Sequence, residues 1–332
     1  MIGPLRPLAL VTVAGVPLGV ELFSGMTEFA YRDVHHGEVD DIRFTLADPL
    51  GSWRSAAGPQ EGDLVTALIG YDGLLGGLIP CGTYELDEPE AEVGADGDLM
   101  SFSGLSAFTS RALRTARSEA YEDTTLAGIV GRVAKRHGMT VVGPVPEVRF
   151  TRITQSKTPD LEFLYRLADD WGCYFSPKGD QLVFIDRLAV DGQEAAHRID
   201  VAPGDLLGTR LRRSAKGLYR RAELAYQDTG SKRTLRAAAE DPRVRSGDVL
   251  KLTDKVENQG QADRLVLARL LRENDGWSTG SVELAGRPSL VAGQVIELGP
   301  TLGRYAGRWL VTAAEHVAGG DGYRTTAEVR GL

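Results

Sequence analysis

The sequence predicts a mainly β protein with an α/β insert, in which two small antiparallel β-barrels flank a two-helix α/β domain. Three observations support this fold class. Glycine occupies 40 of the 332 positions, well above the usual share of about 7%, which favours many turns. Residues 1–108 and 191–332 are dominated by short alternating or apolar runs, the pattern of half-buried strands. Helical spacing of apolar residues begins only in the region between them, residues 109–190.

The first predicted domain, residues 1–108, is a series of short strands. The strand-like runs, separated by Gly, Pro and Asp, cover residues 8–18, 40–49, 62–72, 82–90 and 98–108. This spacing is typical of a small barrel or sandwich. The apolar start contains one basic residue, Pro17 within its apolar stretch and no small-residue cleavage pattern. It therefore predicts strand, turn and strand rather than a secretion signal.

The second predicted domain, residues 109–190, contains two helices. The first follows from an apolar stripe with helical spacing, formed by Leu126, Ile129, Val130, Val133 and Ala134. The second is expected to have Thr158 as its N-cap residue and Pro159 in its first position, and to stop at Gly172. A hairpin with its turn at residues 178–180 follows.

The third predicted domain, residues 191–332, returns to strands. They cover residues 208–215, 219–228, 279–286, 293–299, 308–316 and 323–329. A helix at residues 258–274 interrupts them, because Asn258 and Gln261 have capping-box spacing before an apolar stripe.

The two β regions contain a weak internal repeat. In the first region the markers are Gly62, Gly82, Glu90 and a Gly-Ala-Asp-Gly turn. In the second region they are Gly293, Gly307, Glu315 and a Gly-Gly-Asp-Gly turn, in the same order but with spacings that differ by several residues. The repeat favours two related small barrels.

The motifs of known catalytic and metal sites do not occur. The two cysteines, Cys81 and Cys173, form no Cys-x-x-Cys pair or Cys/His cluster, so we expect neither a disulfide framework nor a metal site. No cofactor-binding motif occurs, and no cofactor is expected. His316, beside Glu315, is expected to be a half-buried strand residue that bonds a loop carbonyl. No apolar run reaches the roughly 18 residues that span a bilayer.

Charge is distributed unevenly along the chain. Residues 1–105 contain 4 Lys and Arg against 17 Asp and Glu, whereas the whole chain has a net charge of −8. Such a first third is not a phosphate-binding surface. It is either a solubilising face or a docking surface for a basic partner.

The acidic hairpin at residues 87–98 leaves an enzymatic alternative open. A β-rich glycan hydrolase would use two of its carboxylates, but that chemistry needs them in unlike environments, and an exposed acidic hairpin is favoured. A monomeric binding module is a further alternative.

The central region resembles a known family. The stretches EAYEDTTLAGIVGRVAKRHGM and ITQSKTPDLEFLYRLADDWGCYFSPKGDQLVFID, with CGTYELDEPE before them and YAGRWLVTAAEHVAGGDGYRTTAEV at the end, resemble the late control gene D family of phage tail proteins. That family is similar to the baseplate hub of T-even phages and to the hub part of type VI secretion spike proteins. The resemblance implies a structural, non-enzymatic baseplate hub in the virion tail or an injection particle, assembled in the bacterial host.

The resemblance also implies partners. It suggests a homotrimer whose doubled barrels adapt a six-fold tail tube to a three-fold spike around a channel. The implied partners are the tail spike protein, the tail tube or tube-initiator protein, baseplate wedge proteins and the tape measure protein, with DNA only in passage. The sequence ends at Leu332 without a β-helix, so the spike is expected to be a separate protein. Five carboxylates are expected to face the channel or the tube-facing rim in part, the alternative being a solvated outer face: Glu85, Asp87, Glu88, Glu90 and Glu92.

Overall fold

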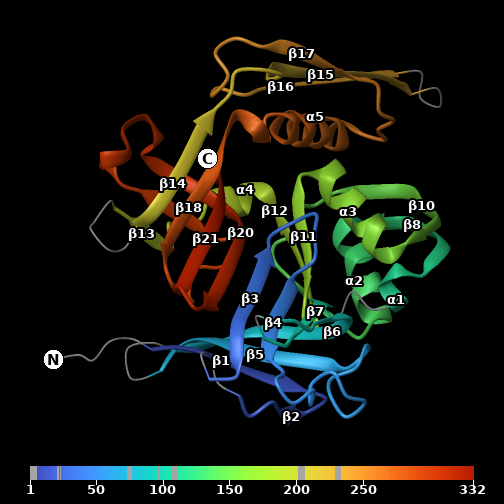
Figure 1. The fold of residues 1–332 in the computed structure, drawn as a ribbon. Coiled ribbons are helices and arrows are strands. Elements are labelled where there is room, and N and C mark those ends of the chain that lie inside the picture. Colours follow the sequence, from blue (N-terminus) through green and yellow to red (C-terminus); the bar gives the residue numbers. More distant parts are fainter. Residues whose placement is uncertain are drawn as a thin grey trace. The chain divides into compact units, whose positions relative to one another are not determined.

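The computed structural model describes residues 6–20, 22, 24–72, 77–95, 97–106, 111–200, 206–228 and 233–332. Contacts divide the chain into two compact units (Figure 1). The first comprises Met1–Ser110, Ala195–Arg210 and Ser281–Val329, and the second comprises Arg111–Glu194, Leu211–Gly280 and Arg330–Leu332. The predicted mainly β fold with an α/β insert is confirmed. The three consecutive domains, and the closure of either β region into a barrel, stay predictions.

The first β region contributes seven strands to one large sheet. They are β1 (Arg6–Val13), β2 (Val16–Pro17), β3 (Met26–Val34), β4 (Asp41–Ala47), β5 (Leu64–Asp72), β6 (Leu78–Glu92) and β7 (Leu99–Ser106). Their order in the sheet is β3-β4-β7-β6-β5-β1-β2. Alternate side chains bury one face of these strands in an apolar core whose largest members include Phe29, Phe44, Tyr84 and Phe102.

The second β region adds six strands to the same sheet. They are β13 (His197–Ile199), β14 (Leu206–Arg213), β18 (Ser278–Ala285), β19 (Val295–Leu298), β20 (Gly307–Gly319) and β21 (Gly322–Gly331), with a 3-10 segment at Pro300–Tyr305. Five of them pair in the order β14-β18-β21-β20-β19. This order repeats β3-β4-β7-β6-β5 strand for strand, and β20 pairs with β3 to join the two five-strand sets.

The repeat extends to the hydrogen bonds. Gly62 N donates to Leu86 O at 2.7 Å, and Gly293 N donates to Val311 O at 2.8 Å. Leu64 pairs with Glu85 and, at the corresponding position, Val295 pairs with Leu310. The β6–β7 hairpin from Gly82 to Ser106 corresponds to residues 307–331 with a constant shift of 225 in residue number, turn included. The weak sequence repeat therefore reflects two copies of one five-strand arrangement.

The second unit begins with α1 (Arg111–Arg114) and contains two small sheets with helices on them. The strands β8 (Ala116–Thr125) and β10 (Arg149–Pro159) pair, and β11 (Cys173–Lys178), β12 (Gln181–Asp186) and β9 (Thr140–Val142) form a second sheet. The helices are α2 (Leu126–Arg136), α3 (Asp160–Trp171) and α4 (Arg187–Asp191). The two predicted helices and the hairpin with its turn at Gly179 and Asp180 are confirmed.

The predicted N-cap of α3 is wrong. Pro159 occupies the cap position, and the Thr158 hydroxyl donates instead to Ser156 O at 2.9 Å. The physical reason is that Pro159 still belongs to strand β10, so the helix begins one residue later than the sequence pattern indicates. For α2, the Thr125 hydroxyl accepts from Gly128 N at 3.1 Å, the expected geometry of an N-cap.

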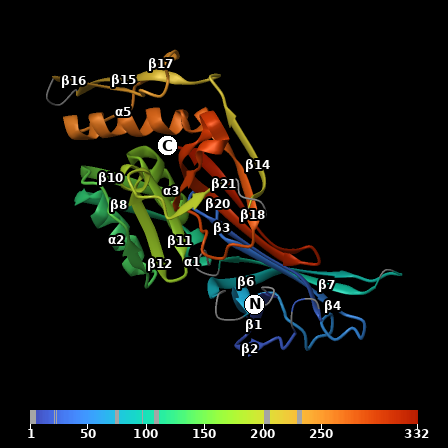
Figure 2. The same cartoon turned by 90° about the vertical axis from the view of Figure 1, so that its left-hand side faces the viewer.

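The remaining part of the second unit is a three-stranded sheet covered by a helix (Figure 2). Strands β16 (Arg233–Glu240), β15 (Tyr219–Asp228) and β17 (Asp248–Leu252) lie against α5 (Gln259–Glu273), which is followed by a 3-10 turn at Asp275–Trp277. The Asn258 side chain accepts from Gln261 N at 2.9 Å, which confirms the predicted start of this helix. These elements are inserted between β14 and β18, the only interruption of the second five-strand order among the described strands.

Candidate functional site

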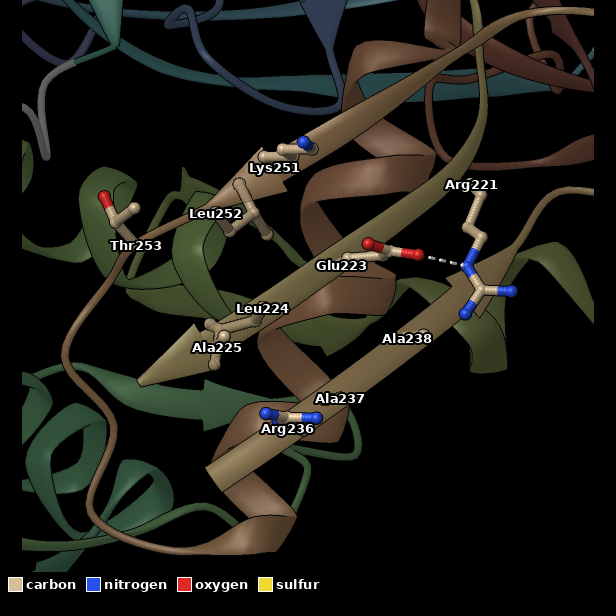
Figure 3. Close-up of a pocket in the computed structure, with 10 residues that line it drawn as sticks. All are labelled: Arg221, Glu223, Leu224, Ala225, Arg236, Ala237, Ala238, Lys251, Leu252 and Thr253. Carbon is tan, nitrogen blue, oxygen red and sulfur yellow. Dashed lines mark ion pairs between the residues drawn. The ribbon is translucent and has the colours of Figure 1, made fainter. Parts of the chain in front are cut away.

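A hollow of about 600 Å³ lies on the β15–β17 sheet (Figure 3). Its charged lining residues are Arg221, Glu223, Arg236 and Lys251, and the other side chains are aliphatic apart from one threonine. Arg221 Nε lies 2.8 Å from Glu223 Oε1. A carboxylate neutralised by a guanidinium on an open sheet does not form the acid and base pair of an active site.

A buried ionic cluster surrounds Asp160 in the second unit. His137 Nε2 lies 2.7 Å from Asp160 Oδ2, Gln155 Nε2 donates to Oδ1 at 2.8 Å, and Arg136 Nη1 donates at 2.9 Å. Burial raises the pKa of Asp160, but the hydrogen bonds from His137, Gln155 and Arg136 outweigh burial and hold that pKa below its ordinary value. The carboxylate is fully buried. It fixes the first turn of α3 to its neighbours and offers no access to a substrate.

His316 is a structural residue of β20. Its Nε2 lies 3.0 Å from Leu290 O and its Nδ1 lies 2.9 Å from the Tyr323 hydroxyl. Because a carbonyl can only accept, Nε2 carries the proton. Burial lowers the pKa of His316 to about 4. The expected bond to a loop carbonyl is confirmed, but the expected half-burial is wrong, because Tyr31 of β3 stacks on the ring and the side chain is fully buried.

The five predicted carboxylates lie on β6, and the structure brings four of them to one face. In the β6–β7 register, Glu85 lies opposite Leu105, Glu88 opposite Ser103 and Glu90 opposite Ser101, while Glu92 continues the row. Residues that lie opposite each other in a sheet point to the same side. The other face carries buried Phe102. We call Glu85, Glu88, Glu90 and Glu92 the acidic row.

A β-bulge makes this row possible. Strict alternation would place Glu85 and Glu88 on opposite faces, but the register shifts between Leu86 and Glu88. The extra residue at Asp87 turns the following carboxylates back to the face of Glu85. Asp87 is exposed, and with Glu88 it lines a shallow hollow of about 290 Å³. Strict alternation of faces along the sequence misses this grouping, because the sequence pattern contains no signal for the bulge.

Neighbouring strands extend the charged face, and sequence reasoning missed their contribution. Arg32 of β3 lies opposite both Asp41 of β4 and Glu315 of β20. Its Nη1 also lies 3.0 Å from Glu328 Oε1 of β21. The alternation in Met26–Val34 carries the missed signal, since Glu28, Ala30 and Arg32 share this face.

The exposed carboxylates in the first strand of the 87–98 hairpin do not resemble a glycosidase pair. Asp87, Glu88, Glu90 and Glu92 are all exposed, so no two of them differ in environment as a general acid and its partner must. Within the described residues, no group of three or more His, Cys, Asp and Glu side chains is arranged to hold a metal ion. The helices in that part of the chain include none with the length and apolarity to cross a membrane.

The large sheet thus contains two copies of one five-strand order and has a charged face. The model of the phage tail baseplate hub (GPD) family matches residues 105–322, well over half of the chain. The chain belongs to this family, and it is a structural component of the tail baseplate.

Three similar proteins agree with this assignment. A probable baseplate hub protein of Escherichia phage 186 is 25% identical over 98% of this chain and 93% of its own length. The 43 kDa tail protein of prophage MuSo2 from Shewanella oneidensis has a TM-score of 0.76 at 14% identity, with 98% of each chain covered. The E. coli c3393 protein, a type VI secretion component described as similar to T4 tail proteins gp27 and gp5, has a TM-score of 0.56 at 12% identity over 96% of this chain and 76% of its own. The two solved structures support the fold.

Proposed function

We propose that the chain forms a homotrimeric baseplate hub that surrounds the delivery channel and adapts the six-fold tail tube to a three-fold spike. The duplicated five-strand set carries this proposal. Three chains with two equivalent sets each present six similar strand groups to the tube, while the second unit occurs three times. One protein can then meet partners of both symmetries with the same copies.

The partners follow from the same arrangement. The tail tube or tube-initiator protein meets the duplicated sheet, and the spike protein meets the three-fold side. Wedge proteins bind the outside, and the tape measure protein and DNA occupy or pass the channel. The likeness to a type VI secretion component supports a role common to contractile injection machines.

Co-purification with the spike protein tests the oligomeric state. We expect the particle to contain three hub chains per three spike chains, measured by light scattering coupled to gel filtration at micromolar concentration. Hub chain alone serves as the control for trimerisation without the spike. A stable complex with one or two hub chains, or a chain that stays monomeric with the spike present, contradicts the trimer.

The acidic face suits a channel wall. Each basic group that contacts DNA phosphate adds salt-dependent affinity, so a passage must be acidic or neutral. Each copy of the chain has a net charge of −8, and the acidic row contributes four carboxylates. We place this face towards the channel or its tube-facing rim.

Charge reversal in the part of β6 that precedes the open residues 88–92 tests that placement. Glu85→Lys and Asp87→Lys together should leave folding intact, because Glu85 is half-buried and Asp87 exposed, and charges near the surface contribute about 0–1 kcal/mol each. Particles carrying this variant should deliver DNA more slowly, with the delay reduced at high salt. The matched control reverses two charges on the second unit, Glu122 and Glu147, and should deliver normally. Equal delivery by both variants would assign the acidic row to a solvated outer face.

A further inference from the structure

The contact between the two five-strand sets uses one half of a long strand. In β20, residues 307–310 pair with β19, and residues 313–319 pair with β3, from Ala313 opposite Val34 to Gly319 opposite Glu28. On its other edge β20 pairs with β21. The second half of β20 therefore extends beyond β19 and meets β3, the first strand of the other set.

The equivalent strand β6 projects in the same way, but its second half has an open edge. Residues up to Glu85 pair with β5, and residues 88–92 pair only with β7 among the described residues. Strand β14, the equivalent of β3, ends the sheet and pairs only with β18 among those residues. One chain thus carries one completed junction and the two separate halves of a second one, which are the uncovered part of β6 and the end strand β14.

We propose that residues 88–92 of β6 in one copy pair antiparallel with β14 of a second copy, in the geometry of the β20–β3 junction. This inference rests on the proposed trimer and names the surface that holds it together. Two different edges that fit each other give a head-to-tail contact, and a head-to-tail contact that closes forms a ring. The occupant of each edge is thereby a second copy of this chain.

The repeat identifies the residues that meet in the proposed junction. The first step is to find which residues of β18 correspond to those of β4. By the shift of 225, Gly331 of β21 corresponds to Ser106 of β7. Ser106 N donates to Asp40 O at 3.0 Å, and the Ser278 side chain lies directly beside Gly331. Ser278 therefore corresponds to Asp40, and Thr279 to Asp41.

The correspondence between β14 and β3 follows from the correspondence between β18 and β4. Arg32 lies opposite Asp41, and Arg212 Nε donates to Thr279 Oγ1 at 3.2 Å. Arg212 thus occupies the place of Arg32. In the junction within the chain, Arg32 lies opposite Glu315, whose counterpart by the shift of 225 is Glu90.

The junction between copies consequently sets Glu90 opposite Arg212 and, two residues along each strand, Glu92 opposite Arg210. All four side chains are exposed in the single chain. Residues 88–92 contain three glutamates and no basic residue, and β14 contains three arginines and no acidic residue. Opposite charges directly across two strands stabilise their pairing, and like charges oppose it. Such charges also keep each open edge from pairing with a copy of itself.

Charge exchange tests the register. Glu90→Arg and Arg212→Glu should each raise the concentration at which half of the chains are trimeric by about tenfold or more. The double variant restores an opposite-charge pair and should return to within about threefold of the natural protein. Glu85→Arg is the matched control, since β5 already fills that part of the β6 edge, and it should assemble normally. Circular dichroism should show the same fold in all four.

A cysteine pair tests the same junction without charge. Ala91→Cys with Leu211→Cys should yield covalently linked dimers and trimers on mild oxidation, whereas Ala91→Cys with Leu207→Cys lies out of register and should not. Normal trimers in both single charge variants, together with no cross-link at residues 91 and 211, overturn the junction while leaving the trimer in place. A natural chain that is monomeric even with the spike overturns both proposals.

Discussion

At the scale of the residue, His316 illustrates how a chemically suggestive side chain can be purely structural. Its two ring nitrogens bond Leu290 O and the Tyr323 hydroxyl, and its ring lies on Tyr31. The sequence placed it on a strand, with a loop carbonyl as its partner. It could not indicate Tyr31, because the two residues meet only through the β20–β3 pairing.

The neutral ring should make folding sensitive to acid. The unfolded histidine has a pKa of about 6.5, and burial lowers the folded pKa to about 4. The unfolded chain therefore binds a proton more readily between these values, and stability is lost as pH falls from about 6.5 towards 4. We expect His316→Phe to lower stability at pH 7.5 by about 1–3 kcal/mol, because two polar groups lose their partner, but to weaken the dependence on acid.

The urea concentrations at which half of the natural chain and half of His316→Phe are unfolded, determined at pH 7.5, 6.0 and 5.0, measure this effect. The exposed neighbour Glu315 provides the control, since Glu315→Gln should shift the midpoints little at any of these values. Parallel pH profiles for the natural chain and His316→Phe would mean that another group causes the acid sensitivity.

At the scale of the element, the sequence predicts the helices α2 and α5 well because short-range interactions determine them. The stripes of α2 and α5 were recognisable because a buried helix face repeats every three or four residues, and Thr125 and Asn258 bond the first turns. The start of α3 was misplaced because β10 runs on to Pro159. That continuation depends on pairing with β8, which sits more than thirty residues earlier in sequence.

Several strands gave no readable signal. The run RTLRAAAE, which forms β16, is rich in good helix formers, yet it pairs with β15 along eight residues. β8 is mostly polar, with Tyr121 as its one buried residue. Such strands are specified by their partners rather than by an apolar face of their own, so alternation alone cannot find them.

Strand β6, which carries the acidic row, has one feature that the sequence predicts and one that it does not. The sequence predicted strand β6 and its carboxylates, but a bulge at Asp87 decides which of them share a face. The repeat is visible in the sequence as ordered glycines and a turn. The equivalent hydrogen bonds at Leu86 and Val311 show that the two copies also share their strand pairing.

At the scale of the whole molecule, the duplication links fold and function. One junction within the chain and two open half-junctions of opposite charge are compatible with a closed ring of identical chains. The family assignment identifies a baseplate hub, and the ring that we propose would let such a hub surround a passage. The proposed position of the acidic row at the channel would limit the adhesion of DNA phosphates.

End-on imaging of the hub bound to its spike tests the central claim most directly. Averaged single-particle views along the symmetry axis should show a ring around an open centre, with three-fold symmetry overall and six similar lobes in the layer of the large sheet. A particle without a central opening, or with two-fold symmetry, would contradict the account.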